Sequence, residues 1–296
     1  MLFSPLQYDE PLFRPPSEAY SLIFQITVGC AWNRCAFCEM YTGKTFRTKP
    51  LEKIKSEIQR AVRLDLGAKK VFLADGDALV LSADKLLPIL SEINSQLKGI
   101  RRISAYAKPK DLASKSLDEL KALKSAGLDL VYVGVESGDD EVLMRVNKGE
   151  TFESTKEGLL KAKQAGIKLS LMILNGLGGK ELSRQHAENS AKLMNAVQPE
   201  FLSTLVLSFP YGEAHFKERF KGDFSVLNIK ELIEEMRIFL ENTDLKQTVF
   251  RSDHASNYLV LKGILDRDKD KLLQAIDRVL ENPEQAGLRK DEERGL

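Results

Sequence analysis

Two hydrophobic patterns alternate along most of the chain. One is a short apolar run of five to eight residues, rich in β-branched side chains and typical of a buried strand. The other is a longer segment with an apolar residue every three or four positions, typical of an amphipathic helix. The strands predicted in this way cover residues 22–28, 70–74, 101–106, 129–135, 167–174 and 201–207. The helices predicted between them cover residues 51–66, 83–98, 116–126, 139–147, 152–165 and 181–197.

The order of these elements predicts the fold class. Strands that alternate with helices of this length form a parallel α/β sheet with right-handed crossovers. Six repeats, fewer than the eight of a closed barrel, predict a partial (β/α)6 TIM-like barrel with a mainly helical C-terminal extension. We expect an irregular proline-rich leader, a barrel core and an extension that closes the barrel mouth, over residues 1–20, 21–210 and 211–296. The extension is predicted to hold helices over 229–241 and 269–281 around an irregular stretch over 243–263.

Composition does not change the predicted fold, but it disfavours nucleic-acid-binding, membrane and secreted proteins. Hydrophobic residues make up 43% of the chain and charged residues 29%, as in ordinary globular proteins. The net charge of +1 disfavours a nucleic-acid partner, which would select a basic surface. The chain has no apolar run near the roughly 18 residues that a membrane span needs, and its first residues lack the basic-then-apolar pattern of a signal peptide. We therefore expect a cytoplasmic protein without a membrane partner.

The cysteines carry the first chemical signal. All three, Cys30, Cys35 and Cys38, lie within nine residues, directly after the first predicted strand. Clustered thiolates are soft ligands for zinc or for an iron–sulfur cluster, and the alternative is three inert buried thiols. A zinc site would need a fourth ligand from a carboxylate or a distant histidine. A [4Fe–4S] cluster with three cysteines keeps one iron open, which favours a catalytic cluster over an electron carrier with four cysteines.

Polar residues also follow three of the predicted strands. Asp75, Gly76 and Asp77 come after the second strand, Glu136 after the fourth, and the glycine-rich turn 175–179 after the fifth. The carboxyl ends of parallel strands meet at one edge of a sheet, where α/β proteins bind ligands. We therefore expect a ligand site at this edge.

The cysteine loop, Gly29 to Tyr41, resembles the cluster loop of radical S-adenosylmethionine (SAM) enzymes. More narrowly, it resembles the branch that includes oxygen-independent coproporphyrinogen oxidase and the Elp3-like proteins. The resemblance covers roughly residues 20–210 and has one departure. Four residues separate Cys30 from Cys35, so the motif is CxxxxCxxC where the family commonly has CxxxCxxC. The resemblance implies that Cys30, Cys35 and Cys38 ligate a [4Fe–4S] cluster.

The resemblance also implies SAM contacts at five positions. Gly76 and Asp77 match the turn that receives the SAM amino group, although Asp-Gly-Asp is also plain turn chemistry. Glu136 resembles the acid that binds the ribose hydroxyls, and its alternative is an acid favoured at a helix N-terminus. Lys148 resembles the cation that neutralises the SAM carboxylate, and Phe37 the aromatic beside the adenine. Solvated charge and ordinary packing are the alternatives for these two residues. The turn 175–179 resembles the one that approaches the adenine.

The activity implied by the resemblance is reductive cleavage of SAM to a 5′-deoxyadenosyl radical, which abstracts hydrogen from a small or medium organic substrate. Such an enzyme is oxygen-sensitive and needs a low-potential electron donor such as flavodoxin or ferredoxin. Two other functions stay open: a non-catalytic haem or iron–sulfur carrier of the same fold, and a zinc-dependent barrel hydrolase. The sequence names no substrate, reaction outcome or further catalytic residue, and does not say whether SAM is consumed or recycled.

Overall fold

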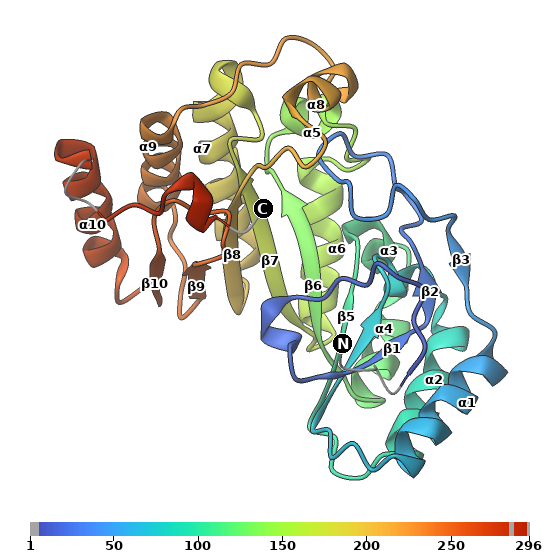
Figure 1. Ribbon diagram of the computed structural model, residues 1–296. Helices are drawn as coiled ribbons and strands as arrows, with labels where there is room; N and C mark the ends of the chain where they lie inside the picture. Colours follow the sequence, from blue (N-terminus) through green and yellow to red (C-terminus); the bar gives the residue numbers. More distant parts are fainter. Residues whose placement is uncertain (1–5, 284–286, 295–296) are drawn as a thin grey trace. The chain divides into compact units, whose positions relative to one another are not determined.

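The computed structural model describes residues 6–283 and 287–294, and its sheet confirms the α/β fold class. Eight strands form this sheet in the order β1-β4-β5-β6-β7-β8-β9-β10 (Figure 1). Their bounds are β1 Leu22–Gln25, β4 Lys70–Ala74, β5 Arg102–Tyr106, β6 Leu128–Glu136, β7 Lys168–Asn175, β8 Phe201–Val206, β9 Val249–Ser252 and β10 Leu261–Ile264. Neighbours from β1 to β6 are parallel, as are β7, β8 and β9, whereas β10 runs antiparallel to β9.

The helices follow the predicted alternation. Their bounds are α1 Leu51–Arg63, α2 Ala83–Gln96, α3 Pro109–Ala113, α4 Leu117–Ser125, α5 Asp140–Arg145, α6 Phe152–Gln164, α7 Gly179–Val197, α8 Glu213–Arg219, α9 Ile229–Glu241 and α10 Lys269–Glu281. Several of them begin with reciprocal caps, of which α4 and α9 are examples. Ser116 caps α4 together with Glu119, and Asn228 caps α9 together with Glu231. Each cap satisfies backbone donors that the first helical turn leaves without partners.

The predicted strand 22–28 is interrupted in the structure. It divides into β1 and β2 (Thr27–Val28), and β2 pairs with β3 (Arg47–Thr48) in a separate antiparallel sheet. The backbone N–H of Ile26 donates to Ala74 O at 2.6 Å, after which the chain turns away from β4. Both pieces are buried, which is why the sequence shows one continuous apolar run. The run does not reveal that the backbone changes its pairing partner between β1 and β2.

The prediction of an irregular stretch over 243–263 is wrong. This segment contains β9, and β10 begins near its end, so the extension adds two strands to the sheet. The short helices α3 and α8 also lack a sequence prediction. The four-residue strands β9 and β10 and the short helices α3 and α8 each span too few periods for a clear hydrophobic pattern.

The chain divides into two compact units. Unit 1 consists of residues 1–33, 40–133 and 157–169, and unit 2 of residues 34–39, 134–156 and 170–296. The division passes through the cysteine loop, so Cys30 belongs to unit 1 and Cys35 and Cys38 to unit 2.

In unit 1 the leader residues 6–20 pack onto the sheet. Tyr8 and Leu12 contact a buried cluster that includes Ile23, Phe72 and Tyr132. The hydroxyl of Tyr132 donates at 2.6 Å to Glu18, which is fully buried and also paired with Arg102. The leader is therefore part of the core of this unit.

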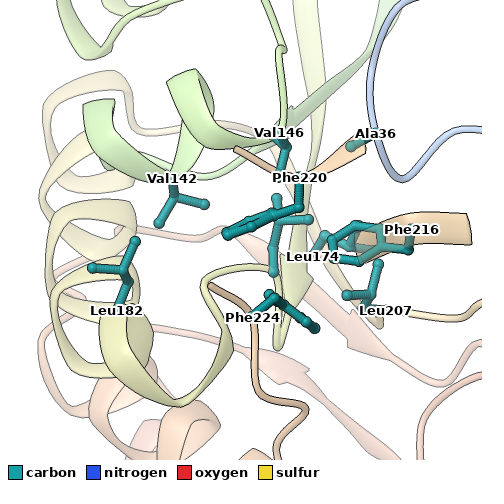
Figure 2. Packing of buried hydrophobic residues seen from close by; sticks show 10 residues of the cluster. Ala36, Val142, Val146, Leu174, Leu182, Leu207, Phe216, Phe220 and Phe224 are labelled. Atoms are coloured by element: carbon teal, nitrogen blue, oxygen red, sulfur yellow. The ribbon is translucent and has the colours of Figure 1, made fainter. Parts of the chain in front are cut away.

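In unit 2 a cluster of phenylalanines lies beside the cysteine loop. Ala36 of the loop is buried in the same cluster as Phe216, Phe220 and Phe224, as Figure 2 shows. The rings of Phe216 and Phe224 are 4.7 Å apart at their centroids, and those of Phe220 and Phe224 are 4.9 Å apart. Truncating one such buried ring to alanine costs about 3–5 kcal/mol, so this cluster anchors the segment around α8.

Candidate cofactor site

The first part of the cysteine loop, residues 29–33, is held within unit 1. Gly29 has a φ of +75° and donates its backbone N–H to Asp75 Oδ2 at 3.1 Å. Asn33 donates from Nδ2 to Tyr41 O at 2.8 Å. The Trp32 ring lies 4.0 Å from Lys110 Nζ, a cation–π contact. These contacts hold the turn that carries Cys30, which follows β2.

The second part, residues 34–39, is held within unit 2. The backbone N–H of Ala36 donates to Val146 O at 2.8 Å, and Cys38 N donates to Cys35 O at 3.3 Å. Asn147 Nδ2 donates to Arg34 O at 3.2 Å. The segment between α5 and α6 therefore supports the loop that carries Cys35 and Cys38.

The donor set fits an iron–sulfur cluster in its chemistry. The three cysteines are half-buried and form no disulfide with any residue that the structure describes, so their sulfur atoms are accessible to a metal. Lys108 lies close enough to Cys30 for their charges to interact, as Lys148 does to Cys35 and Cys38. Among the described residues, no three His, Cys, Asp or Glu side chains already surround one metal position, so ligation by the three cysteines stays a prediction.

At the end of β4, Asp75 holds the base of the loop. Its fully buried Oδ2 accepts hydrogen bonds from Gln25 Nε2 at 3.1 Å and from Lys44 Nζ at 2.8 Å, in addition to Gly29 N. A Cβ on the next residue, Gly76, would lie 2.3 Å from the Tyr41 ring. Asp75 thus stabilises the loop, and position 76 accepts only glycine because the backbone passes against an aromatic ring.

Asp77 lies in a buried charged group that the sequence analysis did not find. Its carboxylate is 0% exposed, and Oδ2 is 2.5 Å from Lys108 Nζ, which is 3.5 Å from Asp111 Oδ2. Burial and the neighbouring Asp111 carboxyl raise the pKa of Asp77 to about 7, although Lys108 lowers it. Asp77 Oδ1 accepts no hydrogen bond from the described residues. Lys108 follows β5, and its place at a strand end was the signal available in the sequence.

Phe37, Glu136 and Lys148 come together in unit 2. Glu136 is 4% exposed and its Oε1 is 3.2 Å from Lys148 Nζ, which lies 5.6 Å from the centroid of the Phe37 ring. Burial acts to lower the pKa of Lys148, but Glu136 and the thiols of Cys35 and Cys38 raise it overall, so this residue stays protonated. The other carboxylate oxygen, Oε2, is buried with no hydrogen-bond partner among the described residues. An acceptor in this state is suited to a bound hydroxyl group.

The backbone makes room for this acid. Glu136 has a φ of +68°, in the left-handed region that is uncommon for residues other than glycine. A Cβ on Gly134 would lie 2.0 Å from Glu136 Oε1. Only glycine at position 134 permits the carboxylate to take this position.

The glycine-rich turn after β7 is held from the C-terminal extension. Glu235 of α9, 2% exposed, accepts from Gly176 N at 2.6 Å and from Ser183 Oγ at 2.6 Å. His186 Nε2 lies 3.8 Å from the same carboxylate, and its Nδ1 shares a 2.7 Å hydrogen bond with Ser137 Oγ. Buried polar side chains thus connect the turn after β7 with the residue that follows Glu136.

The amino-acid sequence around this site matches a known protein family. The model of the family described as the radical SAM superfamily matches residues 24–194. The chain belongs to the radical SAM superfamily. Radical SAM enzymes use a [4Fe–4S] cluster and SAM. The match includes all three cysteines and ends before α8 and α9.

Individual relatives of this radical SAM chain are distant. It is 26% identical over 140 residues to the heme chaperone HemW of Bacillus subtilis, covering 47% of this chain and 37% of HemW. It is 28% identical over 157 residues to the GTP 3′,8-cyclase of Listeria welshimeri, covering 51% of this chain and 44% of the cyclase. The chain thus spans less than half the length of each relative. The coproporphyrinogen III oxidase structure (HemN) from Escherichia coli matches with a TM-score of 0.55 and 18% identity, covering 75% of this chain and 52% of that one.

These comparisons confirm the superfamily, and the solved structure supports the fold alone. The predicted branch and the effect of the extra residue between Cys30 and Cys35 stay predictions. No helix among the described residues is long and apolar enough to cross a membrane.

Proposed function

We propose that this chain is an enzyme that cleaves SAM reductively and abstracts hydrogen from a small or medium organic substrate. The observation that carries the proposal is the group formed by Phe37, Glu136 and Lys148, with its buried carboxylate oxygen that lacks a partner among the described residues. Such an oxygen costs about 1–3 kcal/mol unless a ligand satisfies it. A ribose hydroxyl supplies the donor that it needs.

We assign the cluster to Cys30, Cys35 and Cys38. The chemistry that a [4Fe–4S] cluster and SAM supply together is one-electron cleavage of the sulfonium to methionine and a 5′-deoxyadenosyl radical. The protein supplies binding, orientation and exclusion of water. Lys108 lies near Cys30, and Lys148 lies near Cys35 and Cys38, so each lysine places positive charge beside the proposed ligands.

The SAM contacts are assigned residue by residue. Glu136 Oε2 accepts from a ribose hydroxyl while Oε1 stays paired with Lys148, whose ammonium offsets the SAM carboxylate. The Phe37 ring provides an apolar face for the adenine. Asp77, next to Gly76, accepts a hydrogen bond from the SAM ammonium when the Asp77 carboxylate is ionised. The carboxylate then shares its negative charge between Lys108 and the ligand.

A second function, a haem or iron–sulfur carrier, has one observation in its favour. The chain is similar to a heme chaperone over about half of its length. Hydrogen abstraction and carriage differ in whether the protein forms 5′-deoxyadenosine. For the enzyme, the electron donor is expected to be a low-potential carrier such as flavodoxin or ferredoxin.

The test is anaerobic reconstitution with iron and sulfide, followed by reduction with dithionite in the presence of SAM. We expect about four irons per chain and slow formation of 5′-deoxyadenosine. Replacing Cys30, Cys35 or Cys38 by alanine should abolish the visible absorbance of the cluster and the cleavage. Full cleavage in any of the three variants would disprove that ligand assignment. Four irons without any 5′-deoxyadenosine would favour the carrier, and one zinc without iron would favour the hydrolase.

A paired substitution tests the SAM contacts. Glu136→Ala should leave the iron content unchanged and weaken SAM binding at least tenfold, because the ribose loses its acceptor. Glu141→Ala is the control, since this glutamate of α5 is exposed and pairs with Arg145. Equal SAM affinity in the two variants would refute the assignment of Glu136.

A further inference from the structure

The segment around α8 holds the part of the cysteine loop that carries Cys35 and Cys38. Arg219, the last residue of α8, donates from Nη2 to the backbone carbonyl of Cys35 at 2.8 Å. It donates from Nη1 to Glu39 Oε1, also at 2.8 Å. One guanidinium therefore spans the loop from the second cysteine to the residue after the third. Arg219 lies beyond residues 24–194, so the family match does not include it.

The position of Arg219 is fixed by the core. Phe216, one helical turn earlier, and Phe220, the next residue, are both buried in the phenylalanine cluster that also buries Ala36 (Figure 2). The backbone N–H of Lys221 donates to Arg145 O at 2.9 Å. The guanidinium therefore reaches the loop from an anchored segment, so little conformational freedom is lost when its two hydrogen bonds form.

The charge on Arg219 matters because of Glu39. The Glu39 side chain is 9% exposed, and besides Arg219 its Oε1 has His215 Nε2 at 3.2 Å. A carboxylate next to Cys38 repels a thiolate ligand unless a cation offsets it. The guanidinium carries a positive charge and donates from two nitrogens at once, a geometry that a lysine ammonium does not reproduce.

We propose that Arg219 is a positioning residue for the iron–sulfur cluster. By bridging the Cys35 carbonyl and the Glu39 carboxylate, it holds the loop in its ligating conformation and offsets the acid beside Cys38. The expected consequence is slower loss of the cluster. This inference rests on the proposed function, because it takes Cys35 and Cys38 as ligands.

The experiment measures how fast reconstituted protein loses iron to an anaerobic chelator such as ferrozine. Arg219→Gln should release iron about tenfold faster than the wild type, the change that about 1.4 kcal/mol produces. Arg219→Lys should lie between the two, because lysine keeps the charge without the bidentate contact. Arg237→Gln is the control, because this arginine of α9 pairs instead with Asp277 and Glu241.

A double variant separates positioning from general support of the fold. In Arg219→Gln/Glu39→Gln the repulsive carboxylate is gone, so we expect iron release to slow again by several-fold relative to Arg219→Gln alone. The thermal midpoint of the iron-free protein should be the same for Arg219→Gln and Arg237→Gln. If Arg219→Gln lowers that midpoint, the iron-release rates of Arg219→Lys and of the double variant test the role of Arg219. Slower release in both than in Arg219→Gln supports positioning, and release as fast as in Arg219→Gln refutes it.

The outcomes distinguish this inference from the proposed function. Wild-type protein that takes up no iron refutes the proposed function itself. Wild-type protein that holds about four irons, with Arg219→Gln releasing them at the wild-type rate, overturns only the role of Arg219. Faster release from Arg219→Gln that the Glu39→Gln change does not slow overturns the electrostatic part.

Discussion

Replacement of Glu235 by alanine should destabilise the protein by about 2–4 kcal/mol. The change removes the acceptor of Gly176 N and leaves that backbone donor buried, which costs about 1–3 kcal/mol. Loss of a buried methylene adds about 0.8 kcal/mol, and the cavity adds more. The half-buried Ser183 hydroxyl can turn toward water, so its lost bond adds little.

Glutamine at the same position should cost less than about 1 kcal/mol. Its amide oxygen can accept from Gly176, and its amide nitrogen can donate to the Ser183 hydroxyl, so both groups keep partners. Glu234→Ala is the control, because Glu234 is the neighbouring residue on α9 and forms an exposed pair with Lys230. Surface pairs of this kind contribute about 0–1 kcal/mol.

The pH dependence should separate the two variants further. Burial raises the pKa of Glu235 above its ordinary value, although His186, Ser183 and Gly176 act to lower it. An acid with a raised pKa in the folded protein contributes stability that is fully present below its unfolded pKa. That contribution is lost as the pH rises through the folded pKa. Glu235→Gln lacks this loss, so it should gain stability relative to wild type as the pH rises above about 5.

The assay is urea unfolding of the iron-free protein at about pH 5 and about pH 8, followed by anaerobic measurement of the dissociation constant for SAM. The Ala variant should bind SAM more weakly once refolded, because the turn after β7 loses its anchor. A free energy of unfolding for the Ala variant within about 0.5 kcal/mol of the wild type would refute the reasoning, because surface substitutions usually scatter by about that amount. A Gln variant as unstable as the Ala variant would refute it as well.

Three further predictions concern the cofactor site. Because the pKa of Asp77 is raised to about 7, SAM affinity should rise up to about tenfold between about pH 6 and about pH 8, and Asp77→Asn should flatten that profile in titration calorimetry. The same raised pKa means that the iron-free wild type loses stability as the pH rises through about 7, and the Asn variant should not. Gly134→Ala, whose Cβ would lie 2.0 Å from Glu136 Oε1, should weaken SAM binding at least tenfold, whereas Gly43→Ala, with no atom within 4 Å, should not. Lys148→Gln should also weaken SAM binding, and unchanged affinity would remove this residue from the site.

The regular elements of the core were readable from the sequence. The predicted strand 70–74 and the predicted helices 229–241 and 269–281 agree with β4, α9 and α10 to the residue. These elements depend on neighbours within a few positions, on side-chain periodicity and on caps such as the Asn228–Glu231 pair. The resemblance of the cysteine loop likewise pointed to the superfamily, because a ligand motif consists of residue types that lie close together in the chain.

The residues that support the site could not be read in this way. Arg219 meets Cys35 across 184 positions, and Glu235 meets Gly176 across 59. Nothing local distinguishes these two from the many charged residues on helix surfaces, and both were missed. Their role depends on where α8 and α9 pack, which is decided by burial of residues such as Phe216.

The sequence by itself therefore determined the α/β alternation, the superfamily and the cysteine loop. Only the tertiary structure decided which acids are buried, which cations face them and which helix ends hold the loops. The physical reason is range: periodicity, capping and ligand spacing act over a few residues, whereas burial and charge pairing depend on the whole path of the chain. Asp77 illustrates both, because its place at a strand end was visible in the sequence but its raised pKa depends on Asp111 and on burial.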